Sequence, residues 1–144
     1  MVSTPTILLT AAALTWGAAA VSIARPAPAQ KSTNDGIYTK AQADGASALF
    51  AKVCQSCHPF TVAAKKTPKD LPLGEAPFFD EWEGRPVKEL ISIIVLTMPN
   101  DGSAVLNDQE ATDLVAYILQ QNGFPAGAAP LAKSAGAVID RPKK

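Results

Sequence analysis

The sequence predicts an all-α fold, and three observations lead to this prediction. Apolar residues recur at helical spacing in two segments, 87–95 and 111–119. Signals for a helix start stand ahead of helical segments, because Thr39 and Asn107 are each followed three residues later by Gln or Glu. No alternation of strand and helix patterns is visible along the chain.

The first predicted helix runs from about Lys40 to Cys57. Thr39 and Gln42 fit a capping box at its start. One face carries small and apolar residues at spacings of three and four, namely Ala46, Leu49 and Val53. Residues 59–83 contain four prolines and no clean period, so we expect a long loop with at most one short helical turn.

A second helix is expected from Pro86, which suits a first helical position, to about Met98. The β-branched run 91–95 leaves a strand as the alternative, but Pro86 and the pair Lys88 and Glu89 favour a helix. A third helix should open with a capping box at Asn107 and run to about Gln121. Gly123 and then Pro125 would end it.

The N-terminal segment predicts export. Residues 2–24 carry no charge, and the sequence Ala27-Pro28-Ala29 is a cleavage pattern, so residues 1–29 are interpreted as a secretory signal peptide. No Lys or Arg precedes the apolar run, which leaves an uncleaved membrane anchor as the alternative. The remaining chain divides into a linker (30–38), a helical domain (39–125) and a flexible, Ala/Gly/Pro-rich C-terminal tail (126–144). The expected location is the periplasm.

Composition limits the function further. The formal net charge of the 144 residues is +0, which excludes the strongly basic surface of a nucleic-acid-binding protein. Two cysteines and one histidine cannot form a four-ligand Cys/His zinc site within one chain. Only 6% of residues are aromatic, so the protein core is thin and an additional apolar group would help to fill it.

Charge is distributed unevenly after the signal segment. Residues 30–70 have six basic and three acidic groups, residues 71–123 have two and nine, and residues 124–144 have four and one. The resulting net charges are +3, −7 and +3. This asymmetry either orients a charged redox partner or reflects ordinary solvated helix faces.

The chemistry is carried by Cys54-Gln55-Ser56-Cys57-His58, a C-x-x-C-H motif, which signals covalent attachment of c-type haem. Residues three and four apart face the same way on a helix, so both thiols can reach the two vinyl groups of one porphyrin. His58 would then offer a ring nitrogen to the iron. A thiol–disulfide oxidoreductase is a competing interpretation, but it needs a sheet that the helical pattern does not provide. A structural disulfide is the other alternative, and it gives no reason for His58 to follow.

Met98 is the expected sixth ligand, partly by elimination. The chain has no second histidine, and Met1 would leave with the signal peptide. Pro99 disfavours a helical conformation at Met98, so the thioether can be aimed at the iron. The alternative is that Met98 fills the core and the iron is five-coordinate.

The C-x-x-C-H motif, the sequence Thr97-Met98-Pro99 and the closing helix with Ala116-Tyr117-Ile118-Leu119 together resemble class I monohaem c-type cytochromes. The resemblance covers residues 38–127. Residues 82–127 look like small periplasmic cytochromes associated with quinoprotein-type dehydrogenases. The implied class I cytochrome c fold has three to five helices around the haem, and its first and last helices cross.

The resemblance also implies roles for single residues. Ala46 stands where such cytochromes usually have a glycine at the helix crossing, and Gly45 precedes it. A proline carbonyl in the loop after the haem-binding histidine usually accepts its ring N–H, and Pro72 is preferred to Pro68 for this role. Trp82 resembles a tryptophan near a haem propionate, or it simply closes the core. We expect Tyr117 in the helix crossing and Arg85 in solvent rather than on a propionate.

The predicted function is one-electron transfer by one haem c, attached through Cys54 and Cys57 and ligated by His58 and Met98. The expected partners are a donor dehydrogenase and an acceptor oxidase or cytochrome, with no nucleic acid, and with a membrane only if the signal is uncleaved. We expect no enzymatic activity. Two alternatives stay open: a five-coordinate haem protein that binds a small ligand or peroxide, and a tightly bound subunit of a larger dehydrogenase.

Overall fold

The computed structural model describes residues 31–143, so the signal peptide predicted for residues 1–29 lies outside the described part. The elements in chain order are the 3-10 helix η1 (Thr33–Asp35), α1 (Lys40–Val53), the 3-10 helix η2 (Val62–Ala64), α2 (Glu75–Trp82), α3 (Val87–Thr97) and α4 (Asp108–Gln121). The fold is all-α, as predicted. No helix in residues 31–143 has the length and apolarity needed to cross a membrane.

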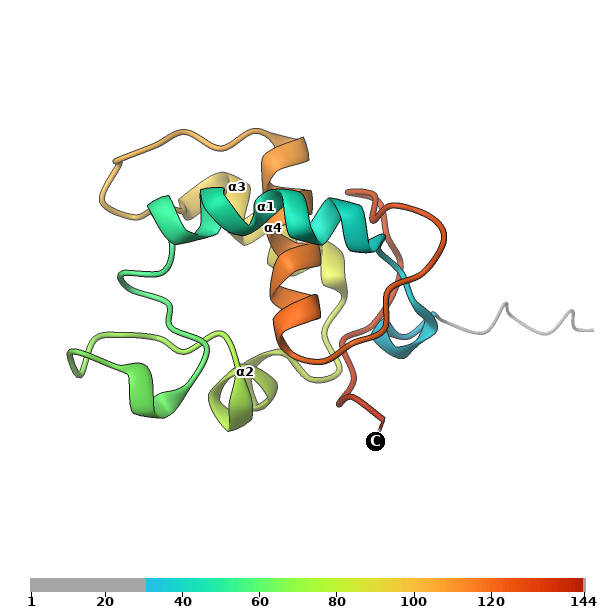
Figure 1. Ribbon diagram of the computed structural model, residues 1–144, viewed down its shortest axis with the longest axis horizontal. Helices are drawn as coiled ribbons and strands as arrows, with labels where there is room; N and C mark the ends of the chain where they lie inside the picture. Colours follow the sequence, from blue (N-terminus) through green and yellow to red (C-terminus); the bar gives the residue numbers. More distant parts are fainter. Residues whose placement is uncertain (1–30, 144) are drawn as a thin grey trace, which may run out of the picture.

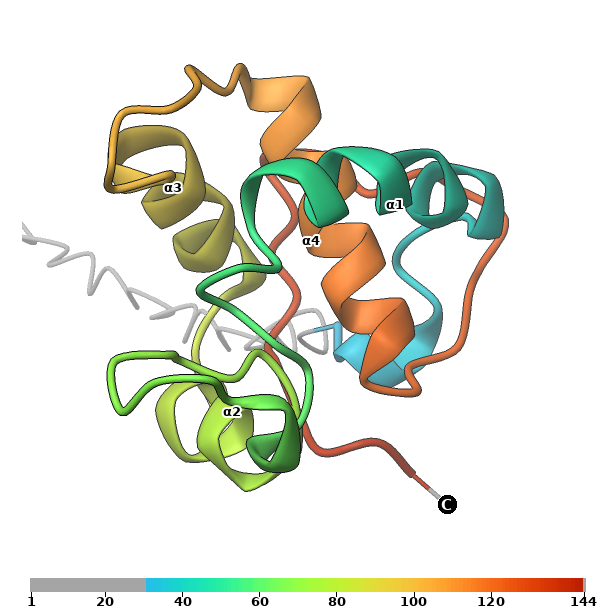
Figure 2. The same cartoon turned by 60° about the vertical axis from the view of Figure 1, so that its left-hand side comes forward.

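The first and last α-helices, α1 and α4, pack against each other, and α3 packs against α4 (Figures 1 and 2). This contact of the terminal helices is the arrangement expected of a class I cytochrome c. Ala46 is 3% exposed on α1, whereas a Cβ added at Gly45 would meet nothing within 4 Å. Ala46 is therefore the small residue on the buried side of α1, and Gly45 faces outward.

Helix starts follow the sequence signals closely. The Asn107 side chain accepts from the backbone N–H of Glu110, and Glu110 accepts in return, so the predicted capping box is confirmed. At α1 only half of the predicted box forms. The Thr39 side chain accepts from the Gln42 backbone N–H, but the Gln42 side chain does not accept from Thr39 in return. The Gln42 side chain instead donates to Asp113 of α4 at 2.8 Å. It thereby links the two crossing helices.

At three places the structure corrects or decides a prediction about the helices. The first helix ends at Val53 rather than Cys57. The expected short turn before residue 83 is an eight-residue helix, α2, which follows Gly74. Residues 87–97 are helical, so the strand alternative for the β-branched run is wrong. Burial explains this result, since Val87, Leu90, Ile91 and Ile94 lie on one face and pack into the core.

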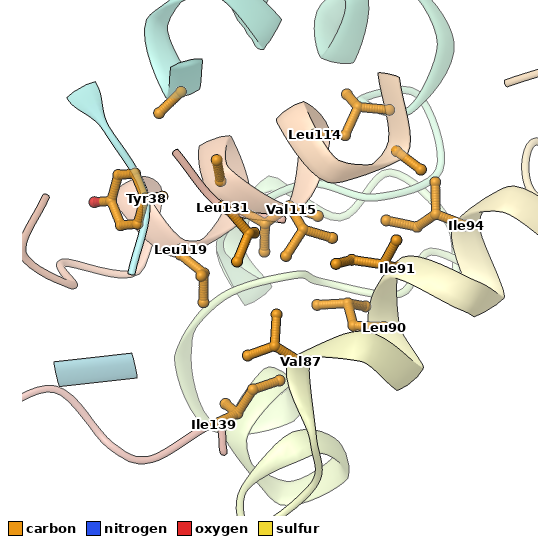
Figure 3. Packing of buried hydrophobic residues seen from close by; sticks show 14 of the residues in the cluster. Tyr38, Val87, Leu90, Ile91, Ile94, Leu114, Val115, Leu119, Leu131 and Ile139 are labelled. Carbon is orange, nitrogen blue, oxygen red and sulfur yellow. The ribbon is translucent and has the colours of Figure 1, made fainter. Parts of the chain in front are cut away.

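The hydrophobic core draws side chains from all four α-helices and from both ends of the described chain. Figure 3 shows Ile91 and Ile94 of α3 directed toward Leu114 and Val115 of α4, with Ile139 near Val87. Leu114, Val115 and Ile139 are fully buried. The C-terminal region thus contributes side chains to the same core as the helices.

Residues 31–38, expected as part of a linker, and residues 126–143, expected as part of a flexible tail, make defined contacts with the helical domain. The Tyr38 hydroxyl donates to the Phe124 carbonyl at 2.6 Å, and the Gly127 N–H donates to the Tyr38 carbonyl at 2.7 Å. Leu131 is 3% exposed. The composition suggested disorder, but a few aliphatic side chains and paired backbone groups are enough to order these segments.

Candidate functional site

The C-x-x-C-H motif forms a turn directly after α1. Cys54 is the C-cap residue of α1, and its carbonyl accepts from the N–H groups of Cys57 at 3.1 Å and His58 at 2.9 Å. Cys54 is half-buried and Cys57 is exposed. The two cysteines are not joined in a disulfide. The turn, rather than a continued helix, brings all three motif side chains to the wall of one cavity.

That cavity has a volume of about 730 Å³. Its wall is formed by the end of α1, the segment after His58, α2, α3 and α4. The apolar lining residues include Phe50, Val53, Leu71, Leu73, Phe78, Trp82, Leu90, Ile93, Ile94, Leu114 and Ile118. A volume in this range, with mostly apolar walls and few polar groups, is typical of a cofactor site. The two cysteines at its edge fit covalent attachment of a porphyrin.

The His58 ring is oriented by a backbone carbonyl. Its Nδ1 lies 3.0 Å from the Leu71 carbonyl oxygen. Since a carbonyl only accepts, Nδ1 carries the proton and Nε2 keeps a free lone pair for a metal. The prediction that Pro72 supplies this carbonyl is wrong by one residue. Pro72 instead lines the cavity.

The segment that contains His58, here called the His-side segment (residues 57–74), is held by hydrogen bonds between residues distant in sequence. The Leu71 N–H donates to the Cys57 carbonyl at 2.9 Å, and the Leu73 N–H donates to the Pro59 carbonyl at 2.8 Å. These two bonds flank the His58–Leu71 contact on either side. They hold the accepting carbonyl in register with the ring.

Two further contacts attach the His-side segment to the helices. The Asn122 side chain, at the end of α4, donates to the Leu73 carbonyl at 2.7 Å. The Phe60 ring stacks on Phe50 of α1 with ring centroids 4.8 Å apart, and it meets Tyr117 of α4 edge-on at 5.8 Å. Tyr117 therefore lies at the helix crossing, and it does not line the cavity.

Met98 reaches the same cavity from the other side. It is the C-cap of α3 with φ −116° and ψ 146°, an extended conformation, so the prediction from Pro99 that Met98 is not helical is confirmed. Met98 is half-buried and lines the cavity together with Pro99 and Asn100. Met98 and the eight residues after it, here called the Met-side segment (98–106), form the long connection between α3 and α4 in Figure 1.

Trp82 is 7% exposed at the end of α2 and lines the cavity. The Arg85 guanidinium carbon lies 4.1 Å from the centroid of its ring. Arg85 also forms ion pairs with Glu81 at 2.5 Å and Glu89 at 3.1 Å. Its charge is therefore compensated by carboxylates of the chain, and it covers the outer face of Trp82.

Several site residues were not predicted from the sequence. No sequence signal identifies Leu71, because it acts through its backbone. Phe78 belongs to an apolar pair in Pro77-Phe78-Phe79, which could have indicated a buried helix face.

Burial raises the pKa of the Cys54 thiol to about 11. A nucleophilic redox thiol requires a lowered pKa, so the thiol–disulfide oxidoreductase alternative is disfavoured.

The crossing terminal helices, the apolar cavity and the cysteine pair with its adjacent histidine together define a c-type cytochrome domain. The family described as Cytochrome C oxidase, cbb3-type, subunit III matches residues 41–118, which is more than half of the 144 residues. The chain belongs to this family, and its cofactor is a covalent haem c held by Cys54 and Cys57. It is an electron-transfer protein. No curated protein and no solved structure gave a significant match.

Proposed function

We propose that the protein is a periplasmic one-electron carrier whose haem iron is ligated by His58 and Met98. The observation that carries the proposal is a shared cavity: His58 and Met98, forty residues apart in sequence, line the same apolar space as the two cysteines. No comparison supports the association with quinoprotein-type dehydrogenases that the sub-family resemblance implied.

The chain's own residues account for the properties that such a carrier needs. When bound, haem c supplies a one-electron couple between ferric and ferrous iron. The Leu71 carbonyl keeps the proton on His58 Nδ1, which leaves Nε2 to bind. The Met98 thioether is a soft ligand without a proton, and it favours the reduced metal. The apolar walls from Phe78 and Leu90 exclude water.

A donor dehydrogenase and an acceptor oxidase or second cytochrome would exchange electrons with the haem. The family name refers to an oxidase subunit, which supports an oxidase as one partner. The net charge of −7 over residues 71–123 supports recognition by a basic partner surface. The same features also suit a tightly bound subunit, which co-purification with a large partner would reveal.

Visible spectroscopy tests the ligand pair most simply. The oxidised wild-type protein should show the weak far-red charge-transfer band of an iron–thioether bond at pH 7. Met98→Leu should remove this band and allow rapid, stoichiometric binding of carbon monoxide to the ferrous form. Leu96→Ala is the matched control, since Leu96 is 79% exposed at the end of the same helix. Rapid carbon monoxide binding by the wild type would instead favour the five-coordinate ligand-binding alternative.

The location has its own test. Mass spectrometry of the protein purified from a periplasmic extract should give an N-terminus at Gln30. An intact Met1 in a membrane fraction would contradict the proposed cleavage and would make the protein membrane-anchored.

A further inference from the structure

The C-terminal strap, defined as residues 137–141, forms the middle segment of a small backbone-paired layer. On one side Val138 pairs with residues 31–33, through a bond from its N–H to the Lys31 carbonyl and one from Thr33 to its own carbonyl, both 2.9 Å. On the other side Ile139 exchanges bonds with Gly84 at 2.8 Å and Arg85 at 2.9 Å. The strap therefore ties the connection between α2 and α3 to the N-terminal segment.

Arg141 extends the strap onto α2 itself. Its Nε donates to Glu83 at 2.8 Å, and its Nη2 lies 3.5 Å from an Asp80 carboxylate oxygen. Its guanidinium carbon lies 5.1 Å from the centroid of the Phe79 ring. Arg141 thus contacts three residues of the last turn and C-cap of α2.

Helix α2 forms a wall of the haem cavity, through Phe78 and Trp82. Among the helices of residues 31–143, extensive contacts join α1 to α4 and α3 to α4, and α2 has no comparable contact with another helix. Figures 1 and 2 both show α2 apart from the other three. The α2 side chains Phe78, Phe79 and Trp82 pack into the hydrophobic core, and the segments at the two ends of the helix add further bonds that hold it in place.

The N-terminal end of α2 is held by Glu75, whose carboxylate accepts from the Val62 N–H at 2.8 Å. The C-terminal end is held by the strap. The family match covers residues 41–118, so both the strap and its partner at 31–33 lie outside the matched region.

We propose that the C-terminal strap is a positioning element for the haem cavity, and that Arg141 and Ile139 hold α2 so that Trp82 closes the cavity edge. The inference rests on the haem site but not on ligation by Met98. Loosening the strap should let α2 open locally and admit water at the Trp82 edge. Water there favours the more highly charged oxidised iron, so the reduction potential should fall.

The test uses the haem-loaded protein, in which Trp82 is the only tryptophan after cleavage before Gln30; Trp16→Phe gives the same condition in an uncleaved chain. Arg141→Gln removes the contacts with α2. Lys143→Gln is the matched control, because it removes the same charge two residues further on, where only the backbone N–H bonds to Asn34. Haem quenches a nearby tryptophan, so Trp82 fluorescence reports its distance from the cofactor.

Arg141→Gln should speed hydrogen exchange of the α2 amides about fivefold, as expected for loss of half-exposed ion pairs and a ring contact. Trp82 fluorescence should rise and the reduction potential should fall. Exchange in α1 and α4 should not change, the far-red absorption should match that of the wild type, and Lys143→Gln should behave as wild type.

A second variant, a chain ending at Gly136, removes the whole strap and should give larger changes of the same kind. The proposal is overturned if α2 exchange, fluorescence and potential stay at wild-type values in both variants. It is also overturned if exchange rises equally in α1, α2 and α4, because this would mean a purely global role. If the shortened chain does not fold, Arg141→Gln alone decides.

Discussion

The two segments that carry the proposed iron ligands are held in different ways. The His-side segment (57–74) is fastened by bonds between residues far apart in sequence, including those from Leu71, Leu73 and Asn122. Within the described chain, every hydrogen bond of residues 99–106 joins two members of that same stretch, as between Gly102 and Pro99 at 3.1 Å. Leu106 is its buried anchor, at 5% exposed, whereas Val105 is 97% exposed.

This difference indicates that the segment with the proposed histidine ligand is held more firmly, and that the segment with the proposed methionine ligand opens at lower cost. Local opening requires few buried contacts and few long-range bonds, and the Met-side segment meets both conditions. Matched substitutions in the two segments should therefore lower the unfolding free energy by unequal amounts. The difference should be largest for glycine replacements and smallest for exposed side chains.

Gly74→Ala should have the largest effect. An added Cβ would lie 2.2 Å from the Phe60 backbone oxygen, so backbone must shift, and we expect a loss of about 3 kcal/mol in unfolding free energy. Gly102→Ala on the Met side meets open space, and only its positive φ of 70° opposes alanine, at about 1 kcal/mol. Urea unfolding of both haem-loaded variants measures the difference. Equal losses would contradict the comparison.

Asn122→Ala should come next. It leaves the Leu73 carbonyl without its side-chain donor, and a half-buried polar group left unpaired should lower the unfolding free energy by about 1–2 kcal/mol. Asn100→Ala is the Met-side counterpart, since the exposed Asn100 side chain has no hydrogen bond to residues 31–143. Its effect, measured by the same urea unfolding, should stay within about 0.5 kcal/mol. A larger loss at Asn100 would show that the Met-side segment is held more firmly than its hydrogen bonds indicate.

Asp70 and Asp101 give a comparison by pH. Hydrogen bonds from the Thr67 hydroxyl and the backbone of Lys66 lower the pKa of Asp70, and hydrogen bonds from Ser103 lower the pKa of Asp101. A lowered folded-state pKa adds stability above the ordinary value of 3.8, which is lost as pH falls through the folded-state pKa. Asp70→Asn and Asp101→Asn should therefore each reduce the decrease in unfolding free energy that occurs on acidification.

Replacing the two aspartates should have different effects on the His58 ring. The turn closed by Asp70 directly precedes Leu71, so Asp70→Asn should shift the NMR resonance of the His58 ring N–H. Asp101→Asn should leave that resonance in place. An unchanged resonance in Asp70→Asn would mean that the Leu71 carbonyl is held by its other bonds alone.

Exposed side chains should matter least. Leu71 is 62% exposed and orients His58 through its carbonyl, so Leu71→Ala should change the unfolding free energy by no more than about 0.5 kcal/mol. Val105→Ala should do the same. Thermal unfolding checks both, and a large loss at Leu71 would show that its side chain, not its backbone, supports the ring.

Much of the fold followed from local sequence signals. Asn107 and Gly123 marked the ends of α4, and the apolar period of residues 87–95 outweighed their β-branched character. The C-terminal strap did not follow, because its order depends on pairing with residues 31–33 and 84–87, which are distant in sequence. Composition alone suggested disorder there.

The site divides in the same way. Side-chain chemistry identified Cys54, Cys57 and His58, and Pro99 correctly predicted a non-helical Met98. The acceptor of the His58 ring N–H was placed at Pro72, one residue too late, because a backbone carbonyl leaves no trace in residue type. Of the cavity wall formed by α2, Trp82 was expected near the haem, but Phe78 was not, since its burial arises only when the helix is in place.

The most direct test of the account is the proton NMR spectrum of the ferrous haem protein. A methionine bound to haem iron lies in the porphyrin ring current, so one three-proton methyl resonance should appear far upfield. It should disappear in Met98→Leu and persist in Leu96→Ala. A wild-type spectrum without this resonance would contradict a haem held between His58 and Met98.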